Sequence, residues 1–116
     1  MGGGGISGLG DEPVTLSDTT IAASDLNTID AATSGTVTAS SVTTLTGTLA
    51  AVATAYASAG ISGLGNAAVT LSDTTATSTA LNALDLLTTG TIDASSVTTV
   101  TGTAATVAGS YTSSGI

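Results

Sequence analysis

Two aspartates recur at the same place in the chain and could supply oxygen ligands to a metal ion. Asp18 and Asp73 each close the sequence Val-Thr-Leu-Ser-Asp, and Thr46 and Thr101 stand at the matching position of two related segments. Carboxylates and hydroxyls are the kind of oxygen ligand that Ca²⁺ binds. Asp18 and Asp73 are therefore the candidate metal ligands of this sequence, and Ca²⁺ is the cofactor that they would bind.

A structural role for this Asp/Thr ladder is favoured over calcium binding. Asp18 and Asp73 would lie two strands apart, on the order of 10 Å at about 4.8 Å per strand, which is too far to share one ion. The bidentate acidic loop of known calcium motifs is also missing. A carboxylate at a strand-to-helix junction instead accepts backbone N–H groups, so we expect a turn or a helix cap.

Two further recurring features have both a functional and a structural interpretation. Asp30 and Asp85 fall late in predicted helices, where the helix dipole disfavours an acid. They therefore either bind a neighbouring segment or lie on a solvated face, and the solvated face is favoured. Threonine pairs spaced for ice or glycan binding are equally explained as exposed strand residues; they are Thr36/Thr38, Thr46/Thr48 and Thr101/Thr103.

The composition excludes several classes of function. The chain has no Lys, Arg, His or Cys, and its eight acids give a net charge of −8. Such a surface repels nucleic acid and anionic membranes. Thiolate, disulfide and histidine sites are excluded as well. Because only carboxylates could activate the many Ser and Thr hydroxyls, we expect no catalytic residue.

The spacing of apolar residues predicts short strands and helices. Val14–Thr19 and Val69–Thr74 alternate Val and Leu with Thr and Ser, which is typical of a strand. Leu49, Val52, Ala53 and Tyr56 have helical spacing, and their counterparts in the second half repeat it. Helices of about 11 to 13 residues are expected, with N-caps at Thr20, Thr48, Thr75 and Thr103 and C′ glycines at Gly35, Gly60, Gly90 and Gly115.

These elements belong to a tandem repeat. Residues 6–60 and 61–115 align without a gap at an offset of 55 residues, and more than half of the aligned positions are identical. Residues 1–5 are a glycine-rich tail, and residue 116 begins a third, truncated copy. Each unit divides again at 27 or 28 residues. We therefore expect an α/β fold, a right-handed β-α solenoid of about four such coils with a parallel sheet on one side and helices on the other. An all-β solenoid is the alternative.

The segment Gly-Thr-Ile-Asp-Ala-Ser-Ser-Val-Thr-Thr-Val-Thr-Gly-Thr-Ala-Ala from Gly90, its partner from Gly35, and the Leu-Asn-x-Leu/Ile-Asp motifs at Leu26 and Leu81 resemble known repeats. They are similar to Thr/Ala-rich tandem repeats of very large exported cyanobacterial proteins. The resemblance covers nearly the whole chain from Ile6 and implies a surface or secreted, adhesin-like or structural module. The glycine- and aspartate-rich calcium nonapeptides that sometimes accompany such repeats are absent.

The expected function is that of a structural or adhesive repeat segment, a spacer in a large extracellular or cell-surface protein. The alternative is a binding module for Ca²⁺, ice or glycan that uses the Asp/Thr ladder. The expected partners are neighbouring repeats stacked end to end, with self-association through exposed ends. No membrane insertion is expected, because the most apolar stretch, residues 45–59, is shorter than the roughly 20 residues of a spanning helix. Residues 1–5 lack the features of a signal peptide.

Overall fold

The computed structural model describes residues 6–116, and the glycine-rich tail predicted for residues 1–5 lies outside the described residues. Within this range the chain forms nine short strands and four helices. The strands are β1 (Val14–Thr15), β2 (Thr20–Ala22), β3 (Val37–Thr38), β4 (Thr44–Gly47), β5 (Ile61–Ser62), β6 (Ala68–Leu71), β7 (Thr75–Thr77), β8 (Ile92–Asp93) and β9 (Thr99–Thr101). The helices are α1 (Ala23–Ala32), α2 (Leu49–Ala57), α3 (Ser78–Asp85) and α4 (Ala104–Thr112).

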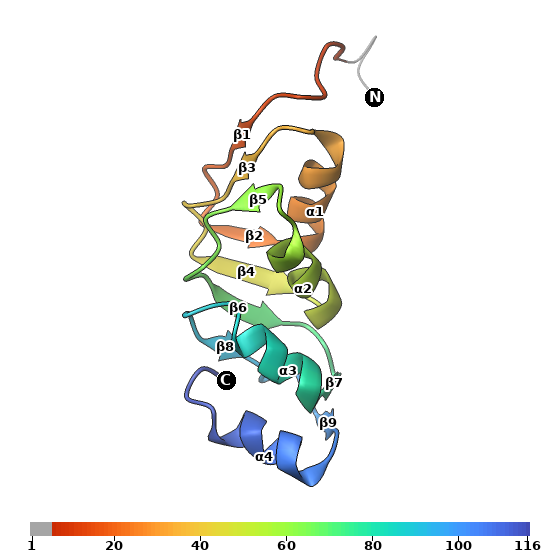
Figure 1. Cartoon of the computed structure of the whole chain (residues 1–116), viewed down its shortest axis with the longest axis vertical. Helices are drawn as coiled ribbons and strands as arrows, with labels where there is room; N and C mark the ends of the chain where they lie inside the picture. The colour runs from red at the N-terminus through yellow and green to blue at the C-terminus, as the bar shows by residue number, and fades with distance from the viewer. Residues whose placement is uncertain (1–5) are drawn as a thin grey trace.

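The strands pair in three parallel ladders. The first joins β1, β3 and β5, the second joins β2, β4, β6 and β8, and the third joins β7 and β9. The molecule is elongated, with extents of 55 × 27 × 20 Å, and the four helices follow one another along its long axis (Figure 1). The predicted α/β class with parallel strands is confirmed, and the four helices exclude the all-β alternative.

The spacing between paired strands differs from the prediction. Val14 pairs with Val37 and Thr20 with Thr44, so paired residues lie 23 or 24 positions apart, and the predicted spacing of 27 or 28 is wrong. Two steps of this size leave about seven residues of each 55-residue unit. These residues separate β6 from β7, so that the chain passes through one more strand before α3 begins. Averaging this extra strand over two coils produced the predicted value.

Both repeats make the same internal pairs. In the first repeat β1 pairs with β3 and β2 with β4, and in the second repeat β6 pairs with β8 and β7 with β9. The repeats are joined to each other by the pairs β3–β5 and β4–β6 and by packing of α2 against α3. We call these contacts the internal joint.

The helix starts were predicted in part. Thr48 and Thr103 cap α2 and α4, because their hydroxyls accept the N–H of Ala51 and of Thr106. Thr20 and Thr75 are not caps but open the strands β2 and β7, and α1 and α3 begin three residues later. In these segments β-branched residues pair in parallel ladders with β4 and β9, which keeps the backbone extended. The helices are accordingly 8 to 10 residues long, shorter than predicted.

The predicted C′ role of the glycines is wrong. Gly35, Gly60, Gly90 and Gly115 do not have positive φ; within residues 6–116 the glycines that do are Gly8, Gly47, Gly63 and Gly102. At Gly63, φ is 92° and a Cβ would lie 2.6 Å from the backbone nitrogen of Ser40, so only glycine fits there. The other helix-end glycines are required for close approach, as the next section describes.

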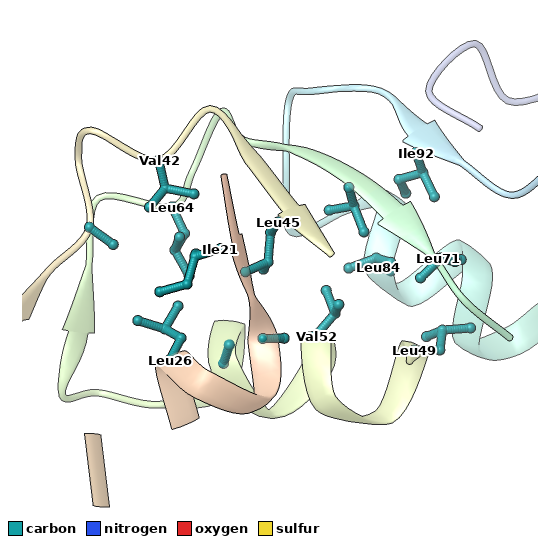
Figure 2. Packing of buried hydrophobic residues seen from close by; sticks show 14 of the residues in the cluster. Ile21, Leu26, Val42, Leu45, Leu49, Val52, Leu64, Leu71, Leu84 and Ile92 are labelled. Carbon is teal, nitrogen blue, oxygen red and sulfur yellow. The ribbon is translucent and has the colours of Figure 1, made fainter. Parts of the chain in front are cut away.

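A continuous aliphatic core lies between the ladders and the helices. Leu26 and Leu45 from the first repeat and Leu71 and Leu84 from the second are fully buried, and Figure 2 shows that the core continues through the internal joint. Each such side chain contributes roughly 1.5 to 3 kcal/mol of burial free energy. Because the core is shared, the two repeats stabilise each other.

Candidate functional site

Asp73 lies in the turn between β6 and β7 and caps the start of α2. Its Oδ1 accepts the backbone N–H of Leu49, the first residue of α2, at 2.6 Å. The hydroxyl of Thr48 accepts the N–H of Ala51 at 3.1 Å. The first four N–H groups of a helix have no partner within the helix, so Asp73 and Thr48 satisfy two of them. The cap that the sequence favoured at this position is confirmed for Asp73.

Asp18 has a different environment from Asp73. It is exposed between β1 and β2, and within residues 6–116 its carboxylate accepts no hydrogen bond. The predicted ladder of Asp18, Thr46, Asp73 and Thr101 does not form, because Thr46 pairs with Ala22 on one side and Thr70 on the other. The extra strand β7 shifts the second repeat to the next ladder. Nowhere in the described part of the chain do three or more Asp, Glu, His or Cys side chains gather in a group that could hold a metal ion.

Hydroxyl side chains do form rows, but the rows are short. Thr15, Thr38 and Ser62 are in register across the first ladder, and Thr46, Thr70 and Asp93 are in register across the second. Because the ladders are offset from one another, no row in the described residues extends over all four coils. The hydroxyl surface is therefore divided into short patches.

Asp30 and Asp85 bind the segment that follows the next helix. The hydroxyl of Ser58 donates to Asp30 Oδ2 at 2.6 Å, and the hydroxyl of Ser113 donates to Asp85 Oδ2 at the same distance. Each serine hydroxyl also accepts the N–H of a glycine two residues later, Gly60 or Gly115, at 3.1 Å. The specific partner that the sequence left as the less favoured interpretation of these acids is therefore present in both repeats.

The glycines at these positions are required by the space available. A Cβ at Gly60 or Gly115 would overlap the carboxylate of Asp30 or Asp85. A Cβ at Gly35 or Gly90 would overlap the backbone carbonyl of Glu12 or Ala67. The four glycines thus allow the end of each helix to approach the preceding coil closely.

The remaining two helix ends use a threonine in place of serine. Thr33 donates to the carbonyl of Glu12 at 2.6 Å, and Thr88 donates to the carbonyl of Ala67 at 2.5 Å. Each threonine hydroxyl also accepts the N–H of the glycine two residues later, at 3.0 Å. All four helix ends therefore carry a hydroxyl residue followed two positions later by glycine, and we call this the hydroxyl-x-Gly clasp. Its residues are Thr33/Gly35, Ser58/Gly60, Thr88/Gly90 and Ser113/Gly115.

The clasp is visible in the sequence, although the sequence analysis did not identify it. The four glycines were noted, but positive φ was assumed to be the reason for them. The signal that would have identified the clasp is the hydroxyl residue two positions before every one of these glycines. Its function is to bind neighbouring segments of the same chain.

Asparagines tie the helices of each repeat together. Asn27 donates through Nδ2 to the carbonyl of Ala51 at 3.0 Å, and Asn82 donates to the carbonyl of Thr106 at 3.1 Å. In the second repeat the hydroxyl of Ser110 also donates to Asn82 Oδ1 at 2.7 Å. The residue that corresponds to Ser110 in the first repeat is alanine, and Asn27 Oδ1 is buried without a hydrogen bond.

Two hollows lie at the ends of the molecule. The C-terminal hollow, of about 210 Å³, is lined by residues that include Leu81, Val97, Val100 and Tyr111. The N-terminal hollow, of about 200 Å³, is lined by Leu9, Glu12, Val14, Ile29 and others. Both are apolar and open, and neither contains two side chains that could act together as acid and base.

Three ionisable groups have shifted pKa values, each with a local structural cause. Hydrogen bonds from the Ser95 hydroxyl and backbone N–H lower the pKa of Asp93, and the N–H of Gly10 lowers the pKa of Glu12. Burial raises the pKa of Tyr56, whose hydroxyl donates to the carbonyl of Leu64 at 2.9 Å. The two acids bind their own turns, and Tyr56 binds across the internal joint.

Comparison with protein-family models, curated proteins and solved structures gave no match for this chain. In the range 6–116, each helix is too short or too polar to cross a membrane.

Proposed function

We propose that the chain is a structural or adhesive repeat segment, a β-α solenoid that acts as a spacer in a large extracellular or cell-surface protein. The single observation that carries this proposal is the use of the recurring polar side chains. Asp30 and Asp85, the four clasp hydroxyls, Asn27 and Asn82 all bind a neighbouring segment of the same chain. Residues that recur in order to stack coils are expected of a spacer.

The composition supports the same proposal. The chain lacks Lys, Arg, His and Cys, so its hydroxyls have no basic partner and its surface has no cation for nucleic acid or anionic lipid. We infer neither catalysis nor nucleic-acid or membrane binding. The extracellular location rests on the resemblance to exported Thr/Ala-rich repeats and on the acidic surface, which salt would screen.

The ion-binding alternative has less support than the spacer. Asp73 caps α2, and Asp18 lies on a different ladder position from the threonines that were to complete the site. The structure provides no specific observation that favours Ca²⁺, ice or glycan over a surface with no bound ligand.

Thermal unfolding in Ca²⁺ separates the two functions. The melting temperature is measured in millimolar CaCl₂, in MgCl₂ at the same concentration, and in chelator at matched ionic strength. A spacer held by its own hydrogen bonds is expected to melt at the same temperature in the two chloride salts. A large increase with Ca²⁺ alone, abolished by Asp18→Asn or Asp73→Asn, would establish an ion site and refute this part of the proposal.

A further inference from the structure

The internal joint shows how one repeat receives the next. Leu64 of the second repeat is only 5 % exposed, and Figure 2 shows it beside Val42 and Leu26 of the first repeat. Tyr56 covers this contact and donates to the Leu64 carbonyl. Beside it, β6 pairs with β4 over four residues, and the N–H of Ala68 donates to the carbonyl of Thr43 at 2.9 Å.

The C-terminal hollow has the residues of the internal joint without an occupant. Leu81, Val97 and Tyr111 correspond by the 55-residue repeat to Leu26, Val42 and Tyr56. Tyr111 is 77 % exposed, whereas Tyr56 is half-buried and hydrogen-bonded. The N–H of Ile92 already donates to the carbonyl of Gly115, as that of Val37 does to Gly60, so the strand ladder has begun to extend.

The N-terminal face resembles the surface that fills this hollow, except at three positions. Leu9 corresponds to Leu64 and is 70 % exposed. The sequence that follows is Asp11-Glu12-Pro13, where the internal joint has Asn66-Ala67-Ala68. All other residues from Ile6 to Thr20 match the second repeat.

Each of the last two replacements opposes docking. Proline has no N–H, so Pro13 cannot make the hydrogen bond that Ala68 donates to Thr43. Ala67 is completely buried, and a carboxylate in its place would enter an apolar joint. Since the chain has no Lys, Arg or His, a buried Glu12 could not be paired with a cation of a second copy.

We propose that the C-terminal hollow is a docking surface for the N-terminal face of another repeat of the Asn66-Ala67-Ala68 type. The segment Asp11-Glu12-Pro13 prevents a second copy of this chain from occupying that surface. The inference rests on the proposed spacer function, because it describes how that spacer adds units and how unwanted addition is blocked. It replaces the general expectation of self-association with a directional rule.

Sedimentation velocity tests the rule with four changes. The unchanged chain is expected to keep one sedimentation coefficient as its concentration rises. The variant Asp11→Asn/Glu12→Ala/Pro13→Ala restores the internal sequence and is expected to associate head to tail, with at least tenfold stronger self-association. Adding Tyr111→Asp, at an exposed position of the hollow, is expected to return that variant to a monomer. Mixing this blocked variant with the unchanged chain is expected to give a one-to-one complex that does not grow further.

Two peptides from the chain provide a test that does not depend on folding of the variants. A peptide of residues 61–72 is expected to shift the NMR signals of Tyr111 and Val97 in the unchanged chain, and a peptide of residues 6–17 is expected to leave them unchanged. Equal binding of both peptides, binding of neither, or a folded triple variant that stays monomeric would overturn the inference. Those outcomes would leave the spacer proposal standing, because the internal joint is covalently linked.

Discussion

Asn27 and Asn82 occupy the same place in the two repeats but differ in how their side-chain oxygens are satisfied. Asn82 Oδ1 accepts the Ser110 hydroxyl, whereas Asn27 Oδ1 faces Ala55, which is 1 % exposed and has no donor. Three positions change together in this seam: Ala23, Ala51 and Ala55 in the first repeat become Ser78, Thr106 and Ser110 in the second. The first repeat therefore has an apolar seam with one unsatisfied oxygen.

Serine at position 55 is expected to supply the missing donor. A buried polar group without a partner costs about 1 to 3 kcal/mol. Ala55→Ser should therefore raise the free energy of unfolding by about 1 kcal/mol, and Ser110→Ala should lower it by about 1 to 3 kcal/mol. Urea unfolding measures both, and Ala57→Ser on the exposed side of the same helix is the matched control. A decrease with Ala55→Ser that exceeds the control would contradict the assignment.

Tyr56 makes the stability of the internal joint depend on pH. Burial raises the pKa of its hydroxyl, so the folded state favours the protonated form. The stabilisation is complete below the ordinary tyrosine pKa of about 10 and is lost as pH rises through the higher value of the folded state. The melting temperature should therefore fall above about pH 10.

The pH effect can be assigned to Tyr56 with two variants. Tyr56→Phe should melt lower at neutral pH, because the bond to Leu64 is lost, and should depend less on pH in the alkaline range. Tyr111→Phe, at an exposed position, should retain the alkaline dependence. Identical alkaline profiles for the two variants would show that Tyr56 is not the titrating group.

At the scale of the elements, the hydroxyl-x-Gly clasp determines where each helix ends and what it contacts. Thr88 and Gly90 hold the segment after α3 against the carbonyl of Ala67, with no room for a Cβ at Gly90. Because the obstructing atoms are backbone, they cannot move aside as a flexible side chain can. Close packing of this kind makes an added methyl group costly.

Gly90→Ala is therefore expected to lower the free energy of unfolding by about 1 to 3 kcal/mol or more. Gly65→Ala is the control, because a Cβ there has no atom within 4 Å. It should change the stability by less than about 0.5 kcal/mol. Chemical unfolding of both variants measures the difference, and equal effects would show that the clasp does not depend on close approach.

The sequence allowed the helices to be predicted better than the ladders. Leu49, Val52 and Tyr56 share one helical face, and Thr48 caps that helix, because both signals are local. The register depends on which strand lies opposite, and the seven-residue addition before α3 moves the whole second repeat by one ladder position. A period of 55 residues cannot show whether it divides equally, so the Asp18 and Asp73 ladder was placed incorrectly.

The binding role of Asp30 and Asp85 could have been predicted more firmly. Both are acids at an unfavourable end of a helix, and each has a serine 28 residues later that donates to it. Recurrence of an unfavourable residue together with its partner indicates a contact. By contrast, the unsatisfied oxygen of Asn27 could be recognised only once the structure placed Ala55 beside it.

At the scale of the whole molecule, the two repeats form one body because the ladders, the helices and the core all continue across the internal joint (Figures 1 and 2). Consecutive helices pack against each other, α1 on α2, α2 on α3 and α3 on α4. An added unit would contribute two more helices to this row. Helix axes in contact lie about 8 to 10 Å apart, so each unit should lengthen the molecule by about 16 to 20 Å.

The central claim is that the 55-residue unit is a rigid element of length, and small-angle X-ray scattering of chains with two, three and four units tests it most directly. The account predicts that the maximum dimension increases by the same amount, about 16 to 20 Å, with each added unit, and that the scattering stays that of a folded rod. An unequal or absent increase, or the scattering of a flexible chain, would contradict the claim that these repeats act as a spacer.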